Sequence, residues 1–234
     1  KLNKYSLKEV YKSQNVILTS KIFQDNMILD IYKKNYLKYL KKIKIKKQYH
    51  RKANNFFKKN FSGSDNILGV HFRGSTYKTA RGHAYPPSAS EMIKNINNLI
   101  KKYGYNKIFL VTEEMKYLKC LKKKFGNKLF FYKSFRMQNI DSFKIYPRTK
   151  HRYKLGEENL IEALLLSKCK GLTYVKSNLT SYAKYLNKNI SDHEIFFGYN
   201  SRNRYISRWK WYLKNYFPIF FGELKMISKK NYNI

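Results

Sequence analysis

The sequence predicts an α/β fold, a Rossmann-like parallel sheet covered by helices. Short apolar runs at 66–72, 107–112, 129–132 and 171–175 alternate with longer stretches whose apolar residues recur at helical spacing. Strands and helices that alternate at these lengths form parallel sheets with right-handed crossovers. Of the 234 residues, 43% are apolar, which is enough to bury a substantial core.

The first 65 residues are the least regular part of the chain. Residues 16–20 are compatible with a short strand. Residues 26–57 are rich in Lys and Tyr, and their apolar side chains recur at helical spacing, which predicts one or two amphipathic helices. The Ser-Gly-Ser-Asp sequence at 62–65 predicts a turn or linker before the first strand of the sheet.

Cap residues bound the elements that follow. A helix over 88–103 begins with a capping box, formed by Ser88 and Glu91, and ends at Gly104. The remaining predictions, in chain order, are a helix over 113–125 closed by Gly126, a polar loop over 133–154, an apolar helix that opens at Leu155 or Gly156, and a helix over 178–187 capped by Ser177.

The formal charge is +36, from 50 basic and 14 acidic residues. Such a charge favours anionic partners, so a basic module that binds nucleic acid or a membrane surface without catalysis is one hypothesis. Only nine of the basic residues are arginine, and the lysines are spread along the chain, so part of the charge is compositional background. The sequence contains no run of 18 or more apolar residues, so it predicts no transmembrane helix.

Neither the cysteines nor the histidines predict a metal site. Cys120 and Cys169 lie in apolar helical patterns, which predicts buried free thiols in a reducing compartment. The five histidines lack the paired spacing of a zinc site. The sequence also lacks the Gly-x-Gly-x-x-Gly, Gly-x-x-x-x-Gly-Lys and Asp-x-Asp patterns, so a standard dinucleotide site, a P-loop and a carboxylate-bound cation are not predicted.

Two polar side chains end the first predicted strand. His71 and Arg73 are two residues apart and leave the same strand face, at the edge where open α/β sheets bind ligands. An arginine there is suited to bidentate contact with a phosphate, although pairing with nearby carboxylates is the alternative. Gly74 then permits a sharp turn and a close approach of the backbone.

Further polar residues follow the other strands. Ser177, Asn178 and Thr180 open a helix whose N-terminal N–H groups predict an anion site, with a plain helix cap as the alternative. Glu113 is placed to accept hydrogen bonds from a ribose or a base, or is an ordinary acid of a first helical turn. Glu162 lies in an otherwise apolar helix, and a solvated helix edge is its alternative.

Three motifs in order resemble the fucosyltransferase superfamily: GVHFRGSTY at 69–77, LGEENLIEALLLSKC at 155–169 and SNLT at 177–180. This superfamily contains the nodulation and core α-1,6-fucosyltransferases, the protein O-fucosyltransferases and bacterial relatives. The resemblance implies a GT-B fold of two Rossmann-like lobes and a metal-independent, inverting transfer from GDP-fucose. It implies that this chain is mainly the C-terminal, donor-binding lobe, with a reduced or truncated N-terminal lobe.

The resemblance also implies roles for individual residues. Arg73 would grip the donor diphosphate and stabilise the departing GDP, and His71 would contact the nucleotide-sugar; these two are the catalytic candidates. The donor-binding positions implied by the motifs are Gly74, the near-guanosine residues Glu113 and Glu162, and the phosphate-binding residues Ser177, Asn178 and Thr180.

Three regions are therefore expected: a remnant of the acceptor-side lobe with a connecting helix at 1–65, a nucleotide-sugar-binding lobe at 66–200, and a basic, aromatic tail at 201–234 that packs back or lies on a membrane surface. The expected partners are a GDP-sugar donor, which is a co-substrate and not a cofactor, and a glycan acceptor, without nucleic acid. The expected location is the cytoplasm, with membrane association as an option, or the Golgi lumen in a eukaryote.

Overall fold

The computed structural model describes residues 44–74, 78, 83–137, 146–201 and 203–216. The chain divides into two compact units, Lys1–Lys46 and Lys47–Ile234, and the elements described below all belong to the second. The predicted strand at 16–20 and the part of the predicted helical region before residue 44 lie outside the described residues.

The described part of the chain forms one parallel sheet of five strands, in the order β3-β2-β1-β4-β5. The strands are β1 Ile67–His71, β2 Lys107–Val111, β3 Leu129–Phe130, β4 Gly171–Tyr174 and β5 Ser191–Glu194. The predicted Rossmann-like sheet is thereby confirmed. The order reverses between β1 and β4, and the crevice at such a switch point is where sheets of this type bind ligands.

The edge strand β5 was not predicted from the sequence. Its residues, Ser-Asp-His-Glu, are polar, and its first two side chains are exposed. It forms a strand because its backbone pairs with β4 along four residues, from Gly171 opposite Ser191 to Tyr174 opposite Glu194. A polar, charged edge strand has no apolar pattern to reveal it, and such charges also protect a sheet edge from pairing with other chains.

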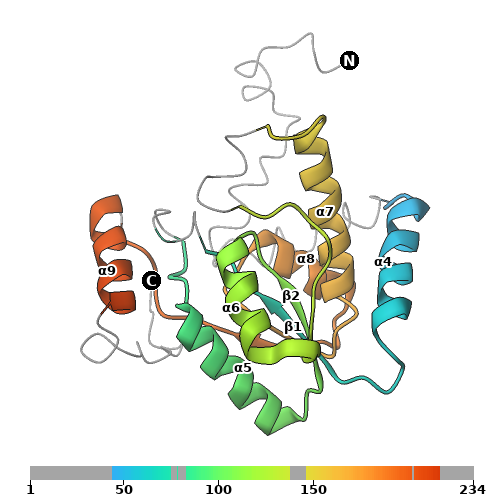
Figure 1. The fold of residues 1–234 in the computed structure, drawn as a ribbon, viewed down its shortest axis with the longest axis horizontal. Helices are drawn as coiled ribbons and strands as arrows, with labels where there is room; N and C mark the ends of the chain where they lie inside the picture. The colour runs from blue at the N-terminus through green and yellow to red at the C-terminus, as the bar shows by residue number, and fades with distance from the viewer. Residues whose placement is uncertain (1–43, 75–77, 79–82, 138–145, 202, 217–234) are drawn as a thin grey trace, which may run out of the picture. The chain divides into compact units, whose positions relative to one another are not determined.

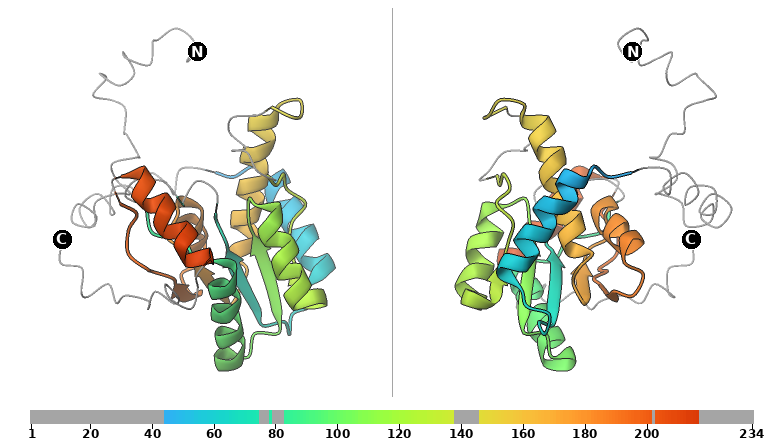
Figure 2. Two further views of the ribbon diagram at one scale, coloured as in Figure 1. Left: turned by 60° about the vertical axis from the view of Figure 1, so that its left-hand side comes forward. Right: turned by 90° about the vertical axis from the view of Figure 1, so that its right-hand side faces the viewer.

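Helices cover both faces of the sheet (Figures 1 and 2). They are α4 Lys47–Asn60, α5 Ala89–Tyr103, α6 Met115–Phe125, α7 His151–Leu166, α8 Asn178–Leu186 and α9 Arg204–Tyr216, with a short 3₁₀ helix at Gly126–Lys128. On one face, Leu68 and Leu110 pack into a core with Met92 of α5 and Leu121 of α6. Alternate residues of β1 face the other side, where a Cβ at Gly69 would meet Leu166 of α7 at 3.0 Å.

The caps of α5 confirm the sequence prediction. The Ser88 hydroxyl accepts a hydrogen bond from the Glu91 N–H at 3.3 Å, and the Glu91 carboxylate accepts one from the Ser88 N–H at 2.7 Å. The helix ends at Gly104, whose φ of +67° lies in the left-handed region that favours glycine. The local pattern of serine, glutamate and glycine thus determines both ends of this helix.

The predicted start of the apolar helix at Leu155 or Gly156 is wrong, because α7 begins at His151, within the predicted polar loop of 133–154. The first turn is polar, so its sequence shows no apolar periodicity. Tertiary contacts order it instead: His151 is 2% exposed and packs edge-on against the ring of Phe135 at 4.8 Å. The hydroxyl of Tyr153 is 2.9 Å from that of Tyr49 on α4.

Helix α4 packs with the sheet although it precedes the predicted lobe boundary at residue 65. The ring of Phe56 lies 5.9 Å from that of Phe109, and the ring of Phe61 lies 5.0 Å from that of Phe130. The predicted turn at 62–65 then leads into β1. The lobe boundaries at residues 65 and 200 remain predictions.

Two further predictions concern the thiols and the membrane. Cys169 is buried, Cys120 is half-buried, and both are free thiols. Burial raises the pKa of the Cys169 thiol well above its usual range, so this thiol stays protonated. None of the described helices combines the length and the apolar content needed to cross a membrane.

Candidate functional site

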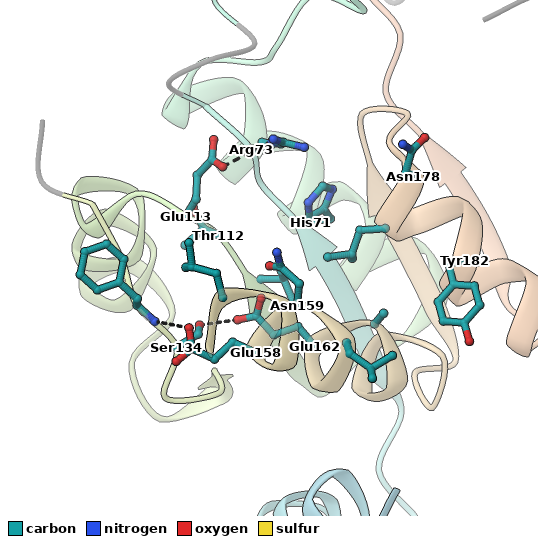
Figure 3. Close-up of a pocket in the computed structure, with 16 residues that line it drawn as sticks. His71, Arg73, Thr112, Glu113, Ser134, Glu158, Asn159, Glu162, Asn178 and Tyr182 are labelled. Atoms are coloured by element: carbon teal, nitrogen blue, oxygen red, sulfur yellow. Dashed lines mark hydrogen bonds and ion pairs between the residues drawn. The ribbon is translucent and has the colours of Figure 1, made fainter. Parts of the chain in front are cut away.

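A cavity of about 410 Å³ lies beyond the carboxyl ends of β1 and β2. Its walls come from these strand ends, from the segment after β3, from α7 and from the first turns of α8 (Figure 3). Five of the predicted site residues line it: His71, Arg73, Glu113, Glu162 and Asn178. The fold thus brings together residues that are more than 100 positions apart in the sequence.

His71 is the last residue of β1 and is only 5% exposed. Burial, together with the positive charge of Arg73, lowers the pKa of its imidazole to about 3. The Nδ1 atom lies 3.4 Å from the hydroxyl oxygen of Ser177, which precedes α8. His71 is therefore neutral at physiological pH, and it connects the end of β1 to the start of α8.

Arg73 lies beside Glu113 in the wall of the cavity (Figure 3). The Nε atom of Arg73 is 3.4 Å from a carboxylate oxygen of Glu113, and the two side chains are 29% and 21% exposed. The alternative prediction, that Arg73 pairs with a nearby carboxylate, is thus confirmed by its contact with Glu113. This contact does not remove Arg73 from the cavity wall, so the carboxylate orients a guanidinium that can also meet an anion.

Gly74 does not line the cavity, although the motif places it among the donor-binding residues. It is buried against α6, where a Cβ would lie 2.3 Å from both the Glu114 carboxylate and the Tyr117 ring. The Tyr117 ring is stacked on Phe72 with 3.9 Å between ring centroids. The predicted close approach at Gly74 is therefore a packing contact that positions the chain after Arg73.

The start of α8 confirms a helix cap that also borders the cavity. The Ser177 hydroxyl accepts from the Thr180 N–H at 3.3 Å, and the Thr180 hydroxyl accepts from the Ser177 N–H at 3.2 Å. Both residues are buried and neither lines the cavity, so their hydroxyls serve the cap. Asn178 does line it, so the first turn of α8 is the part that faces the cavity (Figure 3).

Glu162 is a buried acid in the cavity wall, 4% exposed. One of its carboxyl oxygens accepts a hydrogen bond from the Ser134 hydroxyl at 2.6 Å and lies 3.8 Å from Arg136. Burial is the largest cause that raises the pKa of this carboxyl, to about 7, and these two neighbours oppose it. The alternative prediction, that Glu162 lies on a solvated edge of the helix, is therefore wrong.

The segment after β3 is held against α7 by two arginines. Arg148 makes a bidentate pair with Glu158, at 2.6 and 2.7 Å, and the Phe135 N–H donates to the same carboxylate at 3.1 Å. Arg136 donates to the carbonyl oxygens of Tyr132 and Ser134. These bonds position the hydroxyl that binds Glu162.

Several lining residues were not predicted as site residues. Each of those on α7 lies three or four positions from another lining residue, so the helix face that carries Glu162 was a signal available in the sequence. They are Leu155, Glu158, Asn159, Leu160 and Ala163. Tyr182 lies one helical turn after Asn178. Ser134 and Phe135 lie in a loop without periodicity, so no sequence pattern marks them. Among the residues described, no group of three or more His, Cys, Asp or Glu side chains gathers as a metal site.

No protein-family model matches this sequence, and no curated protein matches it. Among solved structures, it is similar to NodZ alpha-1,6-fucosyltransferase co-crystallized with GDP, with 22% identity, a TM-score of 0.45, and coverage of 63% of this chain and 44% of that chain. It is also similar to fucosyltransferase NodZ from Bradyrhizobium, with 20% identity, a TM-score of 0.45, and coverage of 63% of this chain and 45% of that chain. The similarity to POFUT1 in complex with GDP-fucose has 9% identity, a TM-score of 0.43, and coverage of 63% of this chain and 45% of that chain. The chain spans less than half the length of each.

Proposed function

We propose that this chain is the donor-binding part of a GT-B glycosyltransferase, which moves fucose from GDP-fucose to a glycan acceptor with inversion and without a metal. One observation carries the proposal: the cavity beyond the carboxyl ends of β1 and β2 is lined by Arg73, by the first turn of α8 and by the buried acid Glu162. The three motifs that resemble fucosyltransferases each contribute to this cavity.

In this proposal the diphosphate lies between Arg73 and the N-terminus of α8. The planar guanidinium can bind two phosphate oxygens, and the N–H groups and dipole of a helix N-terminus favour an anion. When the bond between the anomeric carbon and the phosphate oxygen breaks, negative charge builds up on the departing GDP. Positive groups that are already in place stabilise this charge without reorganisation. The neutral His71 supplies a hydrogen bond to the donor without adding charge.

The guanine is proposed to lie against α7. An ionised Glu162 would accept hydrogen bonds from the ring N–H and the amino group of guanine, which are adjacent donors. Uracil offers a single ring N–H, so the same carboxylate would prefer a GDP-sugar to a UDP-sugar. Ser134 and Arg136 keep the carboxyl in place, which reduces the entropy that is lost when the base binds.

Donor binding to the full chain tests the proposal. We expect GDP and GDP-fucose to raise the melting temperature, GDP-mannose to do so less, and UDP-sugars to have no effect. Arg73→Lys keeps the positive charge but loses the planar guanidinium that can bind two phosphate oxygens at once. The variant should therefore lose roughly 2–4 kcal/mol of binding free energy for GDP-fucose. Arg152→Lys is the matched control, because Arg152 lies on α7 but does not line the cavity.

The outcomes separate the two hypotheses for the chain. Donor binding that Arg73→Lys leaves at the wild-type level would refute the role of the cavity. No response to any nucleotide, with tight and steeply salt-dependent binding to nucleic acid, would instead support the non-catalytic basic module. Product analysis with GDP-fucose and a glycan acceptor, with and without a chelator, then tests the inverting, metal-independent transfer.

A further inference from the structure

Helix α9 presents a row of aromatic side chains to the outside. Tyr205, Trp209, Tyr212 and Tyr216 recur at intervals of three or four residues and so share one helix face. Their exposed fractions are 73%, 68%, 41% and 73%. Single exposed aromatic residues are ordinary, but a contiguous row of four marks an interaction surface. We call these four residues the aromatic stripe.

The opposite face of α9 attaches the helix to the rest of the unit. Ser207 is fully buried, and its hydroxyl donates to the carbonyl oxygen of Ser201 at 3.3 Å. The ammonium of Lys78 lies 4.2 Å from the ring centroid of Trp211 and also pairs with Glu114 at the start of α6. With its inner face held in this way, α9 keeps the aromatic stripe exposed to solvent.

The chemistry of the stripe fits a lipid headgroup region. Tyrosine and tryptophan combine an apolar ring with a polar tip, and they concentrate where hydrocarbon meets water. A cation flanks the stripe: Arg208 is exposed, and its guanidinium lies 5.7 Å from the ring centroid of Tyr212. Basic side chains beside membrane-facing aromatics bind anionic lipid phosphates.

The charge of the chain favours an anionic surface over a second copy of the same chain. Pairing two copies would bring two chains of formal charge +36 together, which mutual repulsion opposes. An anionic bilayer instead attracts the same charge, and each basic residue near the surface contributes about 1 kcal/mol. Charge complementarity therefore selects the lipid surface.

We propose that the aromatic stripe docks this chain on an anionic membrane surface, with α9 lying along the headgroup region. A helix of 13 residues is about 20 Å long, whereas the hydrocarbon core is about 30 Å thick, so α9 lies on the bilayer and does not span it. This proposal is independent of the chemistry in the cavity, and it identifies the surface by which the chain would be held near a membrane.

Vesicle co-sedimentation of the full chain tests the proposal. We expect binding to vesicles of phosphatidylcholine with phosphatidylserine, and little binding to phosphatidylcholine alone. The double variant Tyr205→Ser/Trp209→Ser should lower the partition coefficient by about tenfold or more. The matched control is Tyr103→Ser/Tyr146→Ser, which removes two exposed aromatic residues outside α9 (43% and 65% exposed) and should bind like the wild type. Circular dichroism confirms that both variants are folded.

Tryptophan fluorescence locates the contact. Lipids with brominated acyl chains should quench the wild-type emission, and Trp209→Phe should remove most of this quenching because Trp211 faces the protein. The proposal is overturned if the stripe variant and its control bind equally, since charge alone then explains binding. It is also overturned if the wild type does not bind anionic vesicles, or if the stripe variant converts a dimer into a monomer.

Discussion

His71 and Glu162 are two titratable side chains in the wall of one cavity, and burial shifts their pKa values in opposite directions. Burial disfavours whichever form is charged, so it lowers the pKa of the imidazole to about 3 and raises that of the carboxyl to about 7. The imidazole is neutral near pH 7, whereas the carboxyl is close to half-ionised. Arg73 supplies the positive charge in the wall of this cavity.

Glu162→Gln is expected to change how stability depends on pH. The folded protein retains a proton on Glu162 up to about pH 7, whereas the unfolded chain releases it near 4.5. Folded molecules thus bind more protons in this interval, so the free energy of unfolding falls as the pH rises through it. The Glu162→Gln variant has no such proton to release. As the pH rises from about 4.5 to about 8, its free energy of unfolding should increase relative to that of the wild type by roughly 1–3 kcal/mol. Urea unfolding at several pH values measures the gain, and a difference that stays constant with pH would contradict it.

At the scale of elements, the N-terminus of α8 combines a helix cap with a wall of the cavity. Its capping box uses the hydroxyls of Ser177 and Thr180, and the same Ser177 hydroxyl lies near the ring of His71. Helix α5 has an equivalent capping box at Ser88, which does not line the cavity. The two helices therefore provide a natural comparison between a cap that serves stability alone and one that also orders a site.

Ser177→Ala and Ser88→Ala should each lower the free energy of unfolding by about 1 kcal/mol, because each removes one helix cap. Only Ser177→Ala should also weaken GDP binding, because it loosens the first turn of α8 beside Asn178. Denaturant unfolding and calorimetric titration with GDP measure the two effects. Equal GDP affinities in the two variants would show that the α8 cap does not order the proposed GDP site.

At the scale of the whole molecule, the formal charge of +36 opposes the compact state. Like charges repel, and at about 0.15 M salt this repulsion is screened over roughly 8 Å. The 14 acidic residues can pair with only part of the 50 basic ones, as Asp65 does with Lys107 and Glu158 does with Arg148. The remaining excess of positive charge makes the stability of this chain depend on ionic strength.

We therefore expect the melting temperature to rise by several degrees when NaCl increases from about 0.05 M to about 0.5 M, because screening removes part of the repulsion. Differential scanning fluorimetry measures the rise. Sucrose solutions of matched osmolality are the control for effects that do not depend on charge. A melting temperature that is flat or falls with salt would show that local ion pairs outweigh the net repulsion.

The elements with clear local patterns were predictable from the sequence. The apolar runs of β1, β2 and β4, and the Ser-x-x-Glu and glycine caps of α5, depend on neighbouring residues only. The early start of α7 and the polar strand β5 were missed because contacts distant in sequence stabilise them. His151 packs on Phe135, and β5 is a strand only because β4 lies beside it.

The sequence by itself determined the α/β class, the positions of His71 and Arg73 at the end of β1, and the cap before α8, because these follow from short-range periodicity and steric preference. Only the tertiary structure decided that Ser134 would bind Glu162 and that the aromatic stripe of α9 would face outward. The strand order and the burial of one helix face depend on the packing of the whole unit, and a local pattern does not contain this information.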